Sequence, residues 1–98
     1  MIRKSYSKTG RACRVTFRLP AETKATKAAV LGDFNDWQPG AHPLVRRKDG
    51  SLSATLNLAS GRTYRFRYLL NGESWANEPD ADGYAPNRFG TDDSLLEV

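Results

Sequence analysis

The chain has 98 residues and a net charge of +4, a composition typical of a globular domain with one small hydrophobic core. No apolar run is long enough to span a membrane, and the polar residues 1–9 lead into no apolar segment resembling a secretory leader. The one cysteine, Cys13, can form neither an internal disulfide nor a metal cage. We therefore expect a cytoplasmic protein without cofactor or metal, in which Cys13 is a buried, inert thiol.

The basic residues are concentrated at the start of the chain and the acidic residues at its end. Six of the fifteen basic residues lie within positions 1–18, whereas positions 73–98 hold seven carboxylates and one basic residue, Arg88. A nucleic-acid partner would explain a positive charge, but the uneven distribution has a simpler explanation: the two regions lie side by side and neutralise each other. Residues 1–11 are predicted to be a mobile basic tail, and residues 12–98 to form the folded domain.

From residue 14 onward, short segments of alternating polarity are separated by turn residues, which is typical of β-strands. Residues 14–19 carry an apolar side chain at every second position, so we expect one buried face, and Pro20 ends the segment. Asp49-Gly50 and Asn71-Gly72 each predict a tight hairpin. The predicted strands are residues 14–19, 28–32, 44–48, 52–58, 63–70, a short segment with Trp75, and 95–98.

Residues 63–70 form the most aromatic of these segments. The even-numbered positions are aromatic or leucine and are expected to be buried, while the odd-numbered ones, Arg65 and Arg67 among them, face outward.

Residues 77–88 contain two prolines, one glycine and three acids, and are predicted to be a long ordered loop. No helical period is present. The pattern predicts an all-β fold, an immunoglobulin-like (early-set) antiparallel β-sandwich of about seven strands.

The strand at residues 28–32 runs into a polar turn that carries a large aromatic residue, Trp37. Gly32, Asp33 and Asn35 accept bent or left-handed backbone, and this explains why the strand ends there. Two interpretations of Trp37 are open: it folds back to cover the core, or it faces solvent as a flat platform for a ligand. The only histidine, His42, follows in a loop and is expected to be solvated.

The segment Gly32-Asp-Phe-Asn-Asp-Trp37 resembles the G-x-F-N-x-W signature of carbohydrate-binding module family 48. This family includes the glycogen-binding domain of the AMP-activated protein kinase β subunit and the N-terminal early-set domains of isoamylases and branching enzymes. The resemblance continues, in order, through residues 61–68, Asn71-Gly-Glu-Ser-Trp75 and residues 87–98. It therefore spans residues 12–98, nearly the whole chain.

The resemblance implies a glucan site. In family members that bind glycogen, the tryptophans that match Trp37 and Trp75 stack on glucose, and a basic residue that matches Arg67 hydrogen-bonds the hydroxyls. The loop before the last strand supplies a bulky apolar residue, a threonine and an asparagine. These positions are Phe89, Thr91 and Asp93 here.

Two departures from the family pattern affect this site. Asp93 replaces an asparagine and accepts hydrogen bonds without donating any, so part of the hydroxyl network must differ. The second hairpin has one extra residue, Ser74, and this insertion is a reason to expect that the indole of Trp75 is turned away from that of Trp37.

Catalysis by this chain is not expected. Glycoside hydrolysis normally needs two carboxylates that flank the scissile bond in a cleft. The sequence has three close pairs of acids, and all lie in predicted turns or loops, where acids are usually solvated: Asp33 with Asp36, Asp80 with Asp82, and Asp92 with Asp93. A chain of 98 residues has no room for the (β/α)₈ barrel of glycoside hydrolase family 13, so an enzyme label would be inherited through the resemblance.

The sequence thus predicts non-catalytic binding of an α-1,4-glucan, such as glycogen, starch or a maltooligosaccharide. The alternative is an early-set structural or interaction module without a sugar site, which docks a glycoside hydrolase family 13 type enzyme or another protein partner. A third hypothesis, less favoured, is that the N-terminal arginines bind nucleic acid or anionic lipid. No membrane insertion and no metal site are expected.

Overall fold

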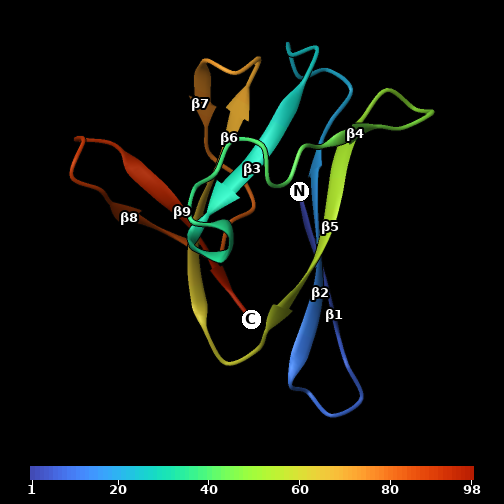
Figure 1. Cartoon of the computed structure of the whole chain (residues 1–98), viewed down its shortest axis with the longest axis vertical. Helices are drawn as coiled ribbons and strands as arrows, with labels where there is room; N and C mark the ends of the chain where they lie inside the picture. Colours follow the sequence, from blue (N-terminus) through green and yellow to red (C-terminus); the bar gives the residue numbers. More distant parts are fainter.

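The structure, a computed structural model, describes residues 1–98 and consists of two antiparallel β-sheets packed against each other (Figure 1). The four-stranded sheet has the order β1-β2-β5-β4, and the five-stranded sheet has the order β3-β6-β9-β8, with β7 also pairing with β6. The elements are β1 (Ile2–Tyr6), β2 (Ala12–Leu19), β3 (Ala28–Gly32), the 3₁₀ turn η1 (Asp33–Asn35), β4 (Val45–Arg46), β5 (Leu52–Ala59), β6 (Thr63–Leu70), β7 (Ser74–Ala76), β8 (Gly83–Pro86) and β9 (Asp92–Glu97).

The predicted all-β sandwich is confirmed, with nine strands instead of about seven. The two additional strands, β1 and β8, lie in the segments predicted to be a tail and a loop. The hairpins at Asp49-Gly50 and Asn71-Gly72 are confirmed, since β4 pairs with β5 and β6 with β7 across them. The one helical element is the three-residue 3₁₀ turn η1, which is far too short to cross a membrane.

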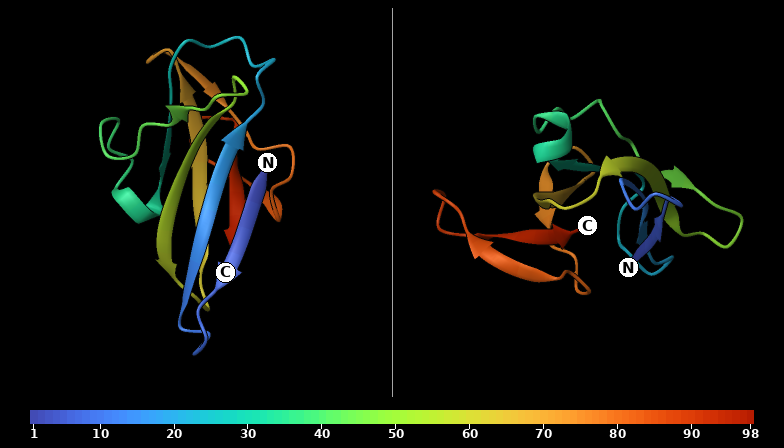
Figure 2. Two further views of the ribbon diagram at one scale, coloured as in Figure 1. Left: turned by 90° about the vertical axis from the view of Figure 1, so that its right-hand side faces the viewer. Right: turned by 90° about the horizontal axis from the view of Figure 1, so that it is seen from below.

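Alternating apolar residues from the two sheets form the core. Figure 2 (left) shows β2 and β5 in front and β6 behind them, with the core between the layers. The Phe17 ring of β2 lies 5.2 Å from that of Phe66 and 6.4 Å from that of Tyr68, both on β6, in edge-to-face arrangements. Such pairs stabilise a fold by about 0.5–1.5 kcal/mol beyond the apolar area they bury. Cys13 is fully buried in the same cluster, as predicted.

The prediction that residues 1–11 form a tail outside the sandwich is wrong. Ile2–Tyr6 pairs along its whole length with β2 as an edge strand. Lys4 points to the core side of this strand, where its Nζ lies 2.7 Å from Asp82 Oδ2 and donates to the Glu97 carbonyl. The basic start and the acidic end of the chain therefore lie side by side here, as the charge distribution suggested.

The prediction that residues 77–88 form a loop throughout is also wrong, because Gly83–Pro86 pairs with β9 as an edge strand. A buried carboxylate, Glu78, fixes the segment that leads to it. Its Oε1 accepts from the Tyr68 hydroxyl at 2.7 Å and lies 2.6 Å from the Met1 ammonium, and its Oε2 accepts from the Asp80 N–H at 2.9 Å. The Tyr84 hydroxyl of β8 donates to the Glu78 carbonyl. Side-chain hydrogen bonds thus hold the connection between β7 and β8.

Candidate functional site

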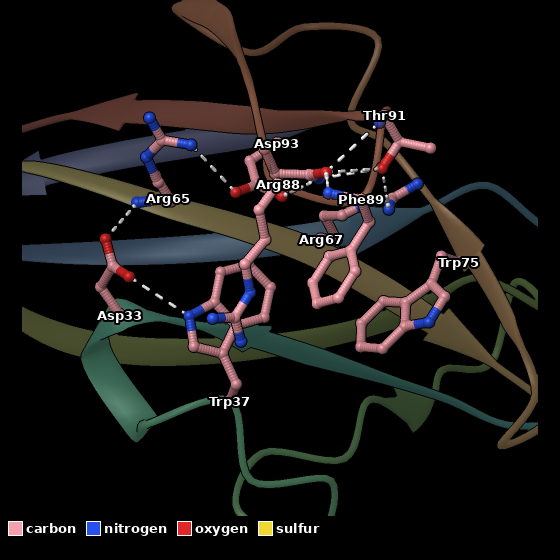
Figure 3. A pocket seen from close by; sticks show the side chains of 10 residues that line it. Asp33, Trp37, Arg65, Arg67, Trp75, Arg88, Phe89, Thr91 and Asp93 are labelled. Carbon is pink, nitrogen blue, oxygen red and sulfur yellow. Dashed lines mark hydrogen bonds and ion pairs between the residues drawn. The ribbon is translucent and has the colours of Figure 1, made fainter.

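A groove of about 690 Å³ lies on the outer face of the five-stranded sheet (Figure 3). Its floor comes from β6, where Arg65 and Arg67 alternate with core residues and therefore point away from the sandwich interior. The lining residues are Asp33, Trp37, Arg65, Arg67, Trp75, Asn87, Arg88, Phe89, Thr91 and Asp93. All six residues predicted from the sequence are among them, so the fold brings them to one place.

Trp37 reaches the groove because the chain turns sharply after β3. Asp36 and Trp37 both have left-handed backbone, with φ values of 54° and 58°. The Asn35 side chain supports the turn: its Oδ1 accepts from the Gly32 N–H at 3.0 Å, and its Nδ2 donates to the Val30 carbonyl at 3.0 Å and to His42 Nδ1 at 2.9 Å. The prediction that His42 is simply solvated is therefore wrong, because its half-buried ring accepts this amide hydrogen bond.

Asp33 fixes the orientation of the Trp37 indole. The indole Nε1 donates to Asp33 Oδ1 at 3.2 Å, and Asp33 Oδ2 accepts from the main-chain N–H of Arg65 at 2.9 Å. One carboxylate therefore links the indole to the main chain of β6 (Figure 3). Trp37 is half-buried and lines the groove.

Trp75 enters the groove from β7, where it pairs with Leu69 and is 46% exposed. The two indole centroids lie 6.4 Å apart, with 64° between the ring planes. The expectation that Ser74 turns the second indole away is thus wrong. The hairpin accommodates the insertion in a three-residue loop, in which Asn71 has a φ of 53° and Ser74 pairs with Leu70.

Arg67 lies between the aromatic residues and the last loop. Its guanidinium carbon is 5.7 Å from the Trp75 ring centroid, and its NH1 donates to Thr91 Oγ1 at 3.3 Å. Its Nε is buried and has no hydrogen-bond partner. The protein therefore leaves part of the donor capacity of this guanidinium unused.

Asp93 lies beneath the groove and is 7% exposed. Its Oδ2 accepts from Arg65 NH1 at 3.2 Å and its Oδ1 from Asn87 Nδ2 at 3.0 Å. Asn87 Nδ2 also donates to Thr91 Oγ1 at 2.9 Å. Both Asp93 oxygens thus position neighbouring polar groups, including a guanidinium that an asparagine could not neutralise.

Phe89 is the most exposed of the large apolar residues, with 77% of its surface open to solvent. It lies at the tip of the loop between β8 and β9, on the groove side (Figure 3). The Arg88 guanidinium carbon is 5.1 Å from its ring centroid. The groove therefore has three aromatic rings on its walls, from three separate turns or hairpins.

Four lining residues were missed by the sequence reasoning: Asp33, Arg65, Asn87 and Arg88. Arg65 could have been found, because it lies two positions before Arg67 on the same strand face. Asp33 and Asn87 read as ordinary turn residues, and only the folded chain shows what their side chains contact. The lining carries three arginines and two aspartates, and no group of His, Cys, Asp and Glu is arranged to hold a metal ion.

A family model described as carbohydrate-binding module 48 (isoamylase N-terminal domain) matches residues 5–87. This range contains both indoles and Arg67 and ends before Phe89, Thr91 and Asp93. A comparison with curated proteins gave no match.

Proposed function

Because the chain belongs to the carbohydrate-binding module 48 family, we propose that it binds an α-1,4-linked glucan without cleaving it. Glycogen, starch and maltooligosaccharides are the candidate ligands. The observation that carries the proposal is the pair of neighbouring indoles, Trp37 and Trp75, on one groove, together with the Arg67 guanidinium, which donates to Thr91 and lies between the indoles and the last loop.

The chemistry of glucose fits these side chains. One face of the pyranose ring consists largely of C–H groups, which pack on an aromatic plane. Stacking of flat ligands on aromatic side chains contributes about 1–3 kcal/mol per ring, and we expect a similar contribution from each indole. Together with hydrogen bonds to the hydroxyls, two stacked glucose units would give a Kd in the micromolar to millimolar range, which is a binding free energy of about −4 to −8 kcal/mol.

The hydroxyl rim of the sugar needs polar partners that are held in place. Arg67 is positioned by Thr91 and by the Trp75 ring, and the Asn87 amide is positioned by its bonds to Thr91 and Asp93. These groups lose little conformational freedom on binding, because the protein already orders them. Arg67 is proposed as the main hydroxyl donor, Phe89 and Thr91 as the loop contacts, and Asp93 as the residue that orients them.

A module that only docks another protein would be supported by two buried indoles, or by a groove covered by residues 77–88. Neither feature is present: Trp75 is 46% exposed, and the segment of β8 lies beside the groove as a paired edge strand. A sugar-binding role is therefore the better supported of the two.

The carboxylates in the groove are poorly suited to hydrolysis. Asp33 and Asp93 are the only two, and both oxygens of each accept hydrogen bonds from protein donors. A catalytic acid and a nucleophile need free oxygens directed at the glycosidic bond. We accordingly propose binding alone as the function of this chain.

The test is a titration of intrinsic tryptophan fluorescence with maltoheptaose, together with co-sedimentation on glycogen. Trp37→Ala and Trp75→Ala are each expected to weaken binding about 5- to 150-fold, the equivalent of about 1–3 kcal/mol. Tyr6→Ala removes an aromatic ring that is 52% exposed on β1, outside the groove, and serves as the matched control.

Saturable binding that is weakened in both tryptophan variants and unchanged in Tyr6→Ala would support the proposal. A wild-type chain that neither responds to maltoheptaose nor sediments with glycogen would refute it. Circular dichroism of each variant establishes that the fold is intact.

A further inference from the structure

The outer face of the four-stranded sheet lies on the opposite side of the sandwich from the groove and carries three arginines, of which only Arg18 has a counter-charge, Asp49. We propose that this face docks an extended acidic segment of a partner protein, with carboxylates at alternate residues. The surface is independent of the glucan groove, so one module could hold a sugar and a protein together.

Strand register places the relevant side chains on this outer face. Directly paired residues of antiparallel strands point to the same side of a sheet, and Val15 and Phe17 of β2 point into the core. Their neighbours on β2, and the residues paired with those neighbours, must point outward. The resulting arginine face includes Arg3 of β1, Arg14, Thr16 and Arg18 of β2, and Thr55 and Asn57 of β5.

The charges on this face are largely unpaired. Arg3 and Arg14 are exposed and their side chains form no hydrogen bond or ion pair. Arg18 has one partner, Asp49 at 3.5 Å, which lies in the turn beyond the end of the strand. No strand position that points outward on β1, β2, β4 or β5 is acidic. Figure 2 (left) looks onto β1, β2 and β5 side by side.

The backbone positions of the three arginines step regularly along the strand direction. Arg3 lies opposite Thr16, which is midway between Arg14 and Arg18 on β2. With a rise of about 3.3 Å per residue, the arginines recur roughly every 6.6 Å. Side chains on one face of an extended chain recur at the same interval. Glutamates at positions i, i+2 and i+4 of a partner segment could therefore each meet one guanidinium, whose planar fork matches a carboxylate.

The other side chains on the face favour a protein over other polyanions. No aromatic residue lies among them, so single-stranded nucleic acid would have no ring on which to stack its bases. Val45 of β4, which is 54% exposed, is the one large apolar strand residue on this face, and a single valine is too little to anchor the surface in a bilayer. Thr16 and Thr55, whose hydroxyls lie 3.0 Å apart, are short and polar, which permits a partner main chain to approach closely.

The size of the face indicates a weak, salt-sensitive contact. Three strands span roughly 10 Å across and the outer arginines roughly 13 Å along the sheet. This is well below the area of about 800 Å² per partner that a stable interface buries. Affinity would thus depend on charge, which salt screens strongly at exposed sites.

The test uses the full chain and a fluorescein-labelled decapeptide in which glutamate alternates with serine, followed by fluorescence anisotropy in 50 mM and 200 mM salt. The double variant Arg3→Gln/Arg14→Gln is expected to weaken binding at least fivefold. The control Lys24→Gln/Lys27→Gln removes the same charge from the exposed loop before β3 and is expected to change binding less than twofold. A melting curve establishes that each variant is folded, and Arg14→Gln/Arg18→Gln replaces the first variant if it is not.

Four outcomes would overturn the proposal. These are no binding of the peptide in 50 mM salt, equal weakening in both double variants, displacement of the peptide by maltoheptaose, and tighter binding of duplex DNA or phosphatidylserine vesicles through the same arginines. Each outcome is separate from the maltoheptaose titration, so failure of this proposal leaves the glucan site to be judged on its own test.

Discussion

The indole of Trp37 donates its Nε1–H to the carboxylate of Asp33 at 3.2 Å, within the same turn. Without this bond the indole could rotate about its side-chain torsions and would have to be ordered by the sugar. Asp33→Ala is therefore expected to weaken maltoheptaose binding about 2- to 12-fold, the equivalent of a hydrogen bond worth about 0.5–1.5 kcal/mol. Calorimetric titration measures the change.

Asp33→Asn should lie between the wild type and the alanine variant, because an amide oxygen can serve only one of the two donors that the carboxylate serves. Glu22→Ala removes an exposed carboxylate from a loop outside the groove and is the control. Unchanged affinity in Asp33→Ala would show that the indole is held by other contacts.

Arg67 is expected to be needed for affinity and not for folding. Arg67→Gln keeps a donor but loses the guanidinium over the Trp75 ring and the contact with Thr91. We expect maltoheptaose affinity to fall about 5- to 30-fold, with little change in the urea midpoint, because this side chain lies outside the core. A large fall in the urea midpoint would instead identify a structural role.

Gly32 is required for close packing of β3 on β6. A Cβ at this position would lie 2.8 Å from the Cβ of Phe66, which is a core residue that cannot move aside. Gly32→Ala is therefore expected to lower the free energy of unfolding by about 1–3 kcal/mol. Gly40→Ala meets nothing within 4 Å and should leave the urea midpoint unchanged.

The hydroxyl of Tyr68 is expected to stabilise the fold through the buried Glu78 carboxylate. Tyr68→Phe leaves that oxygen without one donor and should cost about 1–3 kcal/mol in chemical unfolding. Tyr6→Phe, on an exposed ring of β1, is the control and should have no effect. Equal midpoints for the two variants would contradict the assignment.

The same residue predicts a loss of stability in alkali. Burial, and then the charge of Glu78, raise the pKa of Tyr68 well above its ordinary value near 10. Above pH 10 the unfolded tyrosine releases its proton while the folded one keeps it, so its contribution is complete below pH 10 and declines above it. Between pH 8 and pH 11 the urea midpoint should therefore fall less in Tyr68→Phe than in the wild type.

The ion pair between Lys4 and Asp82 predicts a loss of stability in acid. Burial acts to raise the pKa of Asp82, but hydrogen bonds from Lys4 and from the Glu97 N–H outweigh it and hold the pKa below its ordinary value. The stabilisation is present above pH 4 and is lost as the pH falls through the lowered pKa. Lys4→Gln should thus lower the melting temperature more at pH 7 than at pH 2, where only the hydrogen bond to the Glu97 carbonyl is left to lose. Lys8→Gln, in the following turn, is the control.

Strands with one buried face could be predicted from the sequence. In β2 and β6 every second residue is apolar, and all of these residues are buried except the half-buried Leu70, so the alternation gave both the position of each strand and the side that faces the core. The strands β1 and β8 could not be found in this way, because they are short edge strands. Lys4 occupies a core-side position of β1, and β8 carries a glycine and a proline, so neither shows the expected pattern.

The six groove residues were predicted through their resemblance to a known motif, and the fold brings them together as that motif implies. Their contacts were not predictable, because they depend on segments distant in sequence. Arg65 of β6 reaches Asp93 of β9, and Asp33 of η1 reaches the main chain of β6. Spacing along the chain contains no information about such pairings. The contribution of each residue to sugar binding stays a prediction until the titrations are made.

The inward direction of Lys4 has a consequence for self-association. An edge strand offers unpaired main-chain groups to any passing chain, and a sheet that ends in such a strand is prone to grow by adding others. A new strand beside β1 would press against a charged side chain that is already committed to Asp82 and the Glu97 carbonyl. The ion pair that closes this side of the sandwich thus also discourages aggregation at the sheet margin.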